Sequence, residues 1–183
     1  NTSQNRSFIA AGNYSVTITD NNSCTLSIST VISEPGALSI IESHNDVLCN
    51  GGSTGAINLN VTGGTSPYTF VWNDGNTFQN RTNIPAANYT VTVTDNNACT
   101  VSLNVSITEP SSLAFTETHT DVLCHGASTA SITTTATGGT TPYAYVWNDA
   151  VTTPNRTNLT AGNYSVTLQD NNNCSASLNI SIS

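Results

Sequence analysis

The chain repeats itself with a period of 75 residues. Residues 35–108 align with residues 110–183 without a gap, and 41 of the 74 aligned pairs are identical. The chain contains no lysine, and its three arginines keep the same period: they are Arg6, Arg81 and Arg156. A fixed period of this length indicates that one small structural unit occurs several times and packs against its neighbours along the chain.

Proline marks the expected boundaries between the repeats. The segments Ile-Ser-Glu-Pro and Ile-Thr-Glu-Pro end at Pro35 and Pro110, where proline removes a ladder hydrogen bond and stiffens a short linker. We therefore expect residues 1–34 to be the C-terminal part of a first repeat, residues 35–109 the second repeat and residues 110–183 the third. Because the first is incomplete, we expect this segment to come from a longer array.

Within each repeat, hydrophobic residues alternate with polar ones. The clearest stretch has four apolar residues separated by serine and asparagine, namely Val101, Leu103, Val105 and Ile107. A period of two predicts strands with one buried face. Turn signals such as Gly63-Gly64 divide about six or seven such strands in each repeat, which predicts a small antiparallel sandwich.

Tyrosine and tryptophan also recur at fixed places. Tyr14, Tyr89 and Tyr164 lie in an Asn-Tyr-Ser/Thr-Val-Thr context. This context is similar to the tyrosine corner of immunoglobulin-like sandwiches, where a buried phenol returns its hydroxyl to upstream backbone. Trp72 and Trp147 fall on the strand that would carry the core tryptophan. The predicted fold is thus all-β, a tandem array of immunoglobulin-like antiparallel β-sandwich repeats of 75 residues.

Five cysteines follow the repeat. We expect disulfides between Cys49 and Cys99 and between Cys124 and Cys174, because the first of each pair precedes the first core strand and the second opens the last strand. Cys24 would then pair upstream of this segment. Pairing across the joints, Cys24 with Cys49 and Cys99 with Cys124, also fits the spacing. Disulfides would stabilise a small domain with a thin core and indicate an oxidising, exported location.

The composition argues against several classes of protein. Only 8% of the residues are charged and the formal net charge is −8, so we expect no nucleic-acid partner, since that requires clustered lysine and arginine. No apolar run approaches the roughly 18 residues that cross a bilayer, so we expect no membrane span in this segment. No nucleophile, base and orienting group recur together, so we expect neither an enzyme nor catalytic residues. The histidines His44 and His119 are expected to be solvated strand residues.

Acidic residues are the only candidates for a metal site. Asp20, Asp95 and Asp170 recur in Asp-Asn-Asn-x-Cys and could bind calcium through their oxygens. We favour a hairpin turn stabilised by the aspartate side chain. A second, weaker calcium candidate is the set of acidic residues near the joints, Glu34, Asp46, Glu109 and Asp121. No cofactor is expected, and calcium is the alternative.

The arginines Arg6, Arg81 and Arg156 each follow an asparagine. They could bind an anionic glycan once per repeat, but we expect each to pair with a carboxylate or carbonyl group of its own repeat. The aromatic residues Tyr68, Phe70 and Trp72 share one strand face, so we expect them to pack in the core rather than stack on sugar rings.

Several of these motifs together resemble the SprB repeat. They are Asp46-Val-Leu-Cys49, Val61-Thr-Gly-Gly, Tyr68-Thr-Phe-Val-Trp72, Asn88-Tyr89 and Asp95-Asn-Asn-Ala-Cys99, with counterparts in the last repeat. The resemblance implies a surface protein of gliding Bacteroidetes that is exported by type IX secretion. It also implies long filaments that attach to a surface and are moved by the gliding machinery.

We therefore expect a stalk segment of a large extracellular adhesin that serves surface attachment and gliding motility. Its partners would be neighbouring repeats of the same chain and, through another region, an external surface or polysaccharide. Two alternatives remain: a glycan-binding repeat module of a surface protein, and a structural subunit that self-assembles into filaments.

Overall fold

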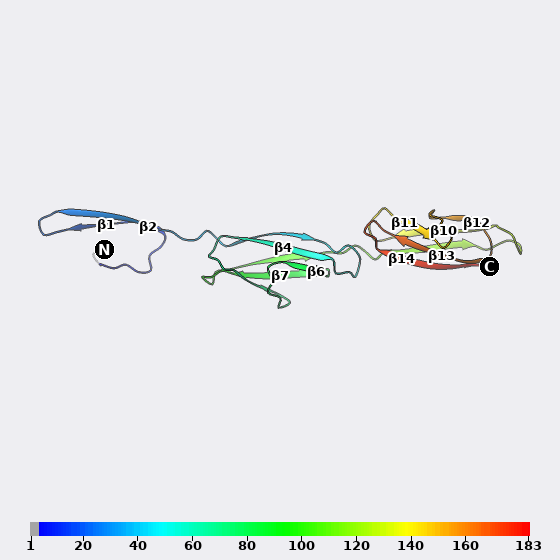
Figure 1. Cartoon of the computed structure of the whole chain (residues 1–183), viewed down its shortest axis with the longest axis horizontal. Helices are drawn as coiled ribbons and strands as arrows, with labels where there is room; N and C mark the ends of the chain where they lie inside the picture. The colour runs from blue at the N-terminus through cyan, green and yellow to red at the C-terminus, as the bar shows by residue number, and fades with distance from the viewer. Residues whose placement is uncertain (1–3) are drawn as a thin grey trace.

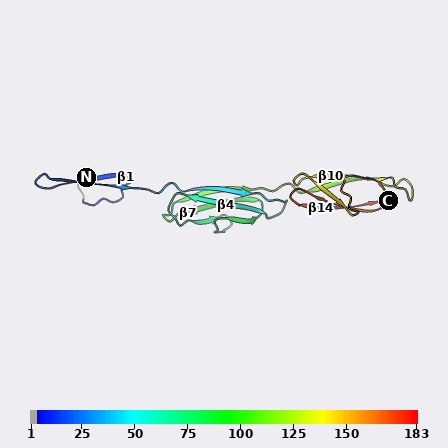
Figure 2. The ribbon, with the colours of Figure 1, turned by 45° about the horizontal axis from the view of Figure 1, so that its top comes forward.

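The computed structural model describes residues 4–183, and this part of the chain contains β-strands and no helix. Three parts follow one another in chain order along the long axis of the molecule (Figure 1). The same order is visible after rotation about that axis (Figure 2). We call the parts the N-terminal hairpin, the middle unit and the C-terminal unit.

The N-terminal hairpin consists of β1 (Gly12–Thr19) and β2 (Thr25–Ile32), which pair antiparallel as a two-stranded sheet. Val16 and Ile18 are 55% and 56% exposed, whereas their counterparts Val91 and Val93 in the middle unit are fully buried. The hairpin therefore has the alternation of a half-buried sheet, but within residues 4–183 no second sheet packs against that face.

The middle unit contains two three-stranded antiparallel sheets, with the orders β3-β4-β6 and β5-β7-β8. Its strands are β3 (Ser39–Asn45), β4 (Gly55–Thr62), β5 (Thr69–Trp72), β6 (Arg81–Ile84), β7 (Ala87–Thr94) and β8 (Thr100–Ile107). Buried residues from both sheets form one core, including Ile57, Trp72 and Val91. The two sheets are thus the layers of a small sandwich.

The C-terminal unit has the same plan, with the sheet orders β12-β10-β9 and β11-β13-β14. Its strands are β9 (Ala114–Thr120), β10 (Ala130–Thr137), β11 (Ala144–Trp147), β12 (Arg156–Leu159), β13 (Gly162–Gln169) and β14 (Ser175–Ile182). Ile132, Trp147 and Val166 lie in its separate core. The predicted all-β fold of antiparallel sandwich repeats is confirmed, while the narrower immunoglobulin-like class stays a prediction.

The alternating sequence pattern explains this burial. In β7, Val91 and Val93 have no exposed surface, while Thr92 between them is half-buried. Burying a side chain of this size contributes about 1.5–3 kcal/mol. Threonine and serine on the outward positions favour extended backbone and keep the outer face polar without charge.

Each unit has two distinct ends. The turns after β4 and β7 lie together, because Thr65 N donates to Asp95 Oδ2 at 2.9 Å. The segments after β3 and β8 lie together at the other end, where Val47 N donates to Thr108 O at 2.9 Å. We call these the N-terminal end and the C-terminal end of the unit, since the chain enters at the first and leaves at the second.

Candidate functional site

The joint between the middle and C-terminal units is held by a covalent bond. Cys49 and Cys174 form a disulfide with a Cα–Cα distance of 5.7 Å and a sequence separation of 125 residues. Cys49 lies in the loop at the C-terminal end of the middle unit, and Cys174 in the turn at the N-terminal end of the C-terminal unit. Cys24, Cys99 and Cys124 are free and exposed.

The expected pairing of Cys49 with Cys99 and of Cys124 with Cys174 is therefore wrong. Within one unit the two cysteines lie at opposite ends, separated by the length of the eight-residue strand β8. Such a strand spans roughly 26 Å, whereas a disulfide requires a Cα–Cα distance of about 4.4–6.8 Å. The alternative pairs across the joints, Cys24 with Cys49 and Cys99 with Cys124, are also wrong, although a bond between units does form.

The Cys49 loop is ordered by its own backbone and by the linker. Gly52 N donates to Cys49 O at 2.9 Å, closing a turn. Asn50 Nδ2 donates to Glu109 Oε1 at 3.0 Å and to Pro110 O at 3.1 Å, and Gly51 N donates to Glu109 Oε2 at 2.7 Å. These bonds tie the loop to the Glu-Pro linker. The direction of the linker is therefore determined both by the proline ring and by the hydrogen bonds from the loop.

The Cys174 turn is ordered by one carboxylate. Asp170 accepts hydrogen bonds from the backbone N–H groups of Thr140, Asn172 and Cys174, each at 2.9 Å. Burial raises the pKa of Asp170, but the three backbone hydrogen bonds lower it by a larger amount. The pKa of Asp170 therefore lies below the usual value of an aspartate. The Asn172 side chain then donates from Nδ2 to Leu48 O of the middle unit at 3.0 Å.

The three aspartates named as calcium candidates occupy turns of this kind. Asp95 accepts from the N–H groups of Thr65, Asn97 and Cys99, and Asp20 accepts from Asn22 N and Cys24 N. These bonds direct N–H donors at the carboxylates, which is the geometry of a side-chain-stabilised turn. Residues 4–183 contain no group of three or more histidine, cysteine or acidic side chains that could hold a metal ion.

Three of the four acidic residues near the joints accept hydrogen bonds from the protein. Asp46 accepts from Thr108 N at 2.7 Å, and Asp121 accepts from Ser183 N at the same distance. The hydrogen bond from Thr108 N lowers the pKa of Asp46. Glu109 is engaged as described above, and Glu34 lines the hollow beside Cys99.

Two of the arginines pair with a carboxylate of their own unit. Arg81 donates to Asp74 from Nη1 at 3.1 Å and from Nη2 at 2.6 Å, and its guanidinium lies 5.2 Å from the centroid of the Trp72 ring. Arg156 makes the corresponding contacts with Asp149 and Trp147. The hydrogen bonds from Arg81 lower the pKa of Asp74. Arg6 lies over the ring of Tyr14 at 5.2 Å.

The repeated tyrosines close one corner each. Tyr14, Tyr89 and Tyr164 donate their hydroxyls to the carbonyl four residues earlier, at 2.7, 3.0 and 3.0 Å. Trp72 and Trp147 are each 2% exposed, and each indole N–H donates to the carbonyl six residues later, at 2.7 and 2.8 Å. In the middle and C-terminal units these aromatic side chains thereby satisfy their polar atoms while packing in or against the two cores.

The histidines on the first strands form local pairs only. His44 Nδ1 lies 3.1 Å from Glu42 Oε2, and His119 Nδ1 lies 3.0 Å from Glu117 Oε2. Each pair is two residues apart on one strand face. No nucleophilic side chain is hydrogen-bonded to either histidine among residues 4–183.

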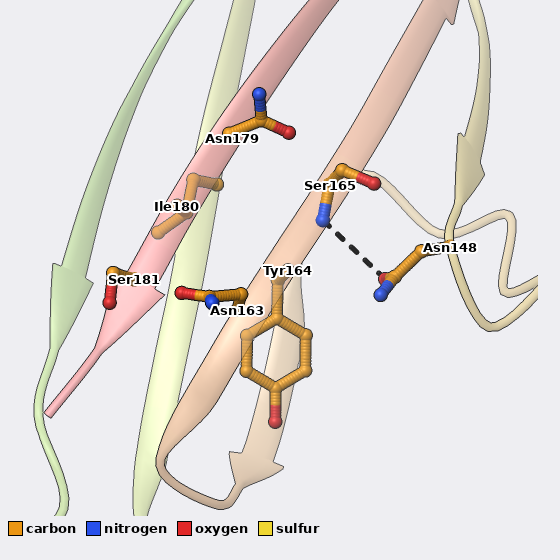
Figure 3. Close-up of a pocket in the computed structure, with 7 residues that line it drawn as sticks. All are labelled: Asn148, Asn163, Tyr164, Ser165, Asn179, Ile180 and Ser181. Atoms are coloured by element: carbon orange, nitrogen blue, oxygen red, sulfur yellow. Dashed lines mark hydrogen bonds between the residues drawn. The ribbon is translucent and has the colours of Figure 1, made fainter.

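An open groove crosses the outer surface of the C-terminal unit. Figure 3 shows asparagine, serine and tyrosine side chains along β13 and β14, together with Asn148 from the neighbouring turn. Ser165 N donates to Asn148 Oδ1 at 3.5 Å. In the middle unit the corresponding bond from Thr90 N to Asn73 Oδ1 is shorter, at 3.2 Å, and Thr90 Oγ1 also donates to Asn104 Oδ1 at 2.6 Å.

Comparison with known families agrees with this architecture. The family model of the SprB repeat matches residues 41–77 and 116–152. The chain carries two SprB repeats. Each match begins within the first strand of a unit and includes the cysteine at the C-terminal end and the core tryptophan. No curated protein matches the chain.

SprB repeats are structural repeats of cell-surface proteins, and the family is not known as catalytic. The chain is therefore a repeat segment of a surface protein. Within residues 4–183, no helix has the length and hydrophobicity needed to cross a membrane.

The residues that dock one unit onto the next are not predicted by the sequence pattern. Asn50, Asn172 and Leu48 were not singled out, although Asn172 follows the repeated Asp-Asn motif. Asn97 and Asn172 occupy equivalent positions, so the recurrence was visible. The sequence does not show that Asn172, at the N-terminal end of its unit, contacts the C-terminal end of the preceding unit.

Proposed function

We propose that this chain is part of the stalk of a large bacterial cell-surface adhesin that serves attachment and gliding motility. The carrying observation is the end-to-end arrangement of SprB repeats with a joint closed by Cys49–Cys174. A stalk must keep its units in line, and the disulfide and the Asn50–Glu109 hydrogen bond restrict bending at the joint.

The surface chemistry supports the same role. Low charge and abundant Asn, Ser and Thr keep the sheet faces wet, while the two cores remain separate. The stalk would be exported by type IX secretion and moved along the cell by the gliding machinery, as the family resemblance implies. Its adhesive contact with a surface or polysaccharide would lie in another region of the parent protein.

The proposal is tested by immunogold labelling of intact source cells with antibodies raised against residues 35–183. We expect label along filaments that project from the cell and movement of antibody-coated beads along live cells. Label confined to the periplasm would refute a surface stalk. If the antibody labels the cell surface but the antibody-coated beads never move along live cells, the part of the proposal that concerns gliding is refuted.

Carbohydrate binding by the C-terminal unit is a second candidate function. Within residues 4–183, the Asn163 and Asn179 side chains in the groove of Figure 3 have no hydrogen-bond partner in the protein, and both are exposed. Such amides suit sugar hydroxyls because each offers both donors and an acceptor. Arg156 is a weaker glycan candidate, since its side chain is only 11% exposed and is bonded to Asp149.

A polysaccharide affinity column tests this second function. Asn163→Ala with Asn179→Ala should reduce retention at unchanged melting temperature. The matched control is Asn88→Ala with Asn104→Ala in the middle unit, where the Asn104 carbonyl oxygen is already engaged. Equal retention of all three proteins, or no retention of any, would refute carbohydrate binding by this groove.

A further inference from the structure

The C-terminal end of the C-terminal unit has the same internal structure as the end that already forms a joint. Leu48 N donates to Thr54 Oγ1 at 2.8 Å, and its counterpart Leu123 N donates to Thr129 Oγ1 at 2.9 Å. Gly52 N donates to Cys49 O at 2.9 Å, and Ala127 N donates to Cys124 O at 3.0 Å. The loop that carries Cys124 is therefore already in the conformation of the loop that carries Cys49.

The difference between the two loops is their exposure. Leu48 is 49% exposed at the joint, whereas Leu123 is 83% exposed. Val47 is 3% exposed and belongs to the core, whereas Val122 is only half-buried. An open hollow lies beside this loop and is lined by Val122, Leu123 and Cys124, among others. The apolar surface around Leu123 is thus left open, whereas the equivalent surface around Leu48 is partly covered by the C-terminal unit at the existing joint.

The complementary surface recurs as well. Cys99 N donates to Asp95 Oδ1 at 2.8 Å, just as Cys174 N donates to Asp170 Oδ1 at 2.9 Å. Both aspartates are 5% exposed. The N-terminal end of a unit is therefore also preformed, with its cysteine held by the same carboxylate whether or not a partner is bonded to it.

We propose that the C-terminal end of the C-terminal unit docks onto the N-terminal end of a further copy of the same repeat, and that Cys124 closes this joint with a disulfide. The partner cysteine is the counterpart of Cys174 in that copy. When the copy follows in the same chain, this cysteine lies 125 residues after Cys124, which is the separation of Cys49 and Cys174. The proposal depends on the joint geometry alone and does not require adhesion.

Formation of this bond is an oxidation. The two thiols lose two protons and two electrons, and a sulfur–sulfur bond forms between them. A disulfide oxidant of the exported compartment accepts the electrons, and in the experiment below oxidised glutathione does so and becomes two molecules of glutathione. The loop differs at two positions, with His125 in place of Asn50 and Ala127 in place of Gly52. The ring N–H of His125 can donate to the linker glutamate as the Asn50 amide does, and Ala127 keeps the turn hydrogen bond to Cys124 O.

The test adds a second copy of residues 109–183 directly after Ser183, so that the period of 75 residues is kept. The protein is refolded with reduced and oxidised glutathione, remaining thiols are alkylated, and the chain is cleaved before aspartate. The counterpart of Cys124 in the added copy is replaced by serine, because its peptide would otherwise be identical to that of Cys124. Each remaining cysteine then lies on a peptide of its own sequence, so non-reducing mass spectrometry identifies every pair. We expect Cys49 bonded to Cys174, Cys124 bonded to the added counterpart of Cys174, and Cys24 and Cys99 alkylated.

The matched control is Cys124→Ser in the same extended chain. It should keep the Cys49–Cys174 bond and leave the added counterpart of Cys174 alkylated. Alkylated Cys124 in the parent extended chain would overturn the proposal, as would a bond from Cys124 to any cysteine of its own unit. Absence of the Cys49–Cys174 bond would overturn it too, because the joint on which the proposal is built would not exist.

Discussion

Removing the disulfide at the joint should cost the protein several kcal/mol of unfolding free energy. The perturbation is Cys49→Ser with Cys174→Ser. The bond closes a loop of 125 residues, for which the chain-entropy estimate is about 5 kcal/mol. If only the middle unit unfolds, the closed loop is about half as long, which lowers the estimate by only about 0.6 kcal/mol. We therefore expect a loss of about 4–5 kcal/mol in either case.

Urea unfolding followed by tryptophan fluorescence is suited to this measurement, because each unit has one core tryptophan, Trp72 or Trp147. With a urea slope of about 1–2 kcal/mol/M, the midpoint should fall by about 2–5 M. The control replaces Cys24, Cys99 and Cys124 by serine and should leave the midpoint unchanged. An unchanged midpoint in the double variant, or a lowered one in the triple variant, would refute the assigned pairing.

Three further predictions concern single residues. Tyr89→Phe removes the hydroxyl that donates to Pro85 O and should lower the unfolding free energy by about 1 kcal/mol in urea titration; no loss would show that the corner bond is not stabilising. Gly63→Ala should cost about 3 kcal/mol or more, since its φ is +72° and the new Cβ would lie 1.9 Å from Ala37 O. Gly75→Ala, with φ +81° and no neighbour within 4 Å, should cost only about 1 kcal/mol, and equal losses would contradict the role of the close approach. Burial raises the pKa of Asp95, but the backbone hydrogen bonds from Thr65, Cys99 and Asn97 have the larger effect and hold this pKa below its usual value. The stabilisation by Asp95 is therefore present above the unfolded-state pKa and is lost as pH falls through the folded-state pKa. Circular dichroism should show weaker acid dependence for Asp95→Asn, and an unchanged dependence would contradict this assignment.

Much of the fold is predictable from the sequence because it depends on local patterns. Alternation along β7 and β8 places Val91 and Val93 inside the unit, and both are fully buried. The repeat period is likewise a property of the residues themselves. Such signals require no knowledge of which strand lies beside which.

The disulfide could not be predicted because it depends on strand direction. β5 pairs antiparallel with β7, and β6 pairs antiparallel with β4. The turns after β4 and β7 lie at the same end, so β5 and β6 run in the same direction. If every strand reversed the one before it, Cys49 and Cys99 would lie at one end of the unit. The segment between β5 and β6 returns without forming a strand, and this moves the two cysteines to opposite ends.

The joint residues were hidden for a related reason. Asn172 contacts Leu48, which is 124 residues away in the sequence. A periodic pattern shows that Asn97 and Asn172 are equivalent, but not that one such residue contacts the preceding unit. That contact follows only from the end-to-end packing of the folded units.

The bond between Cys49 and Cys174 also determines how tension passes along the molecule. A pull on the two ends runs through β3 to Cys49, across the sulfur bridge to Cys174, and out through β14. The 125-residue separation that it bridges corresponds to roughly 440 Å of extended chain, which is thereby removed from the loaded path. Even if both units lost their folded structure, the covalent bond would keep this length from being drawn out, so the reach of the segment under load is limited by covalent chemistry rather than by the stability of its cores.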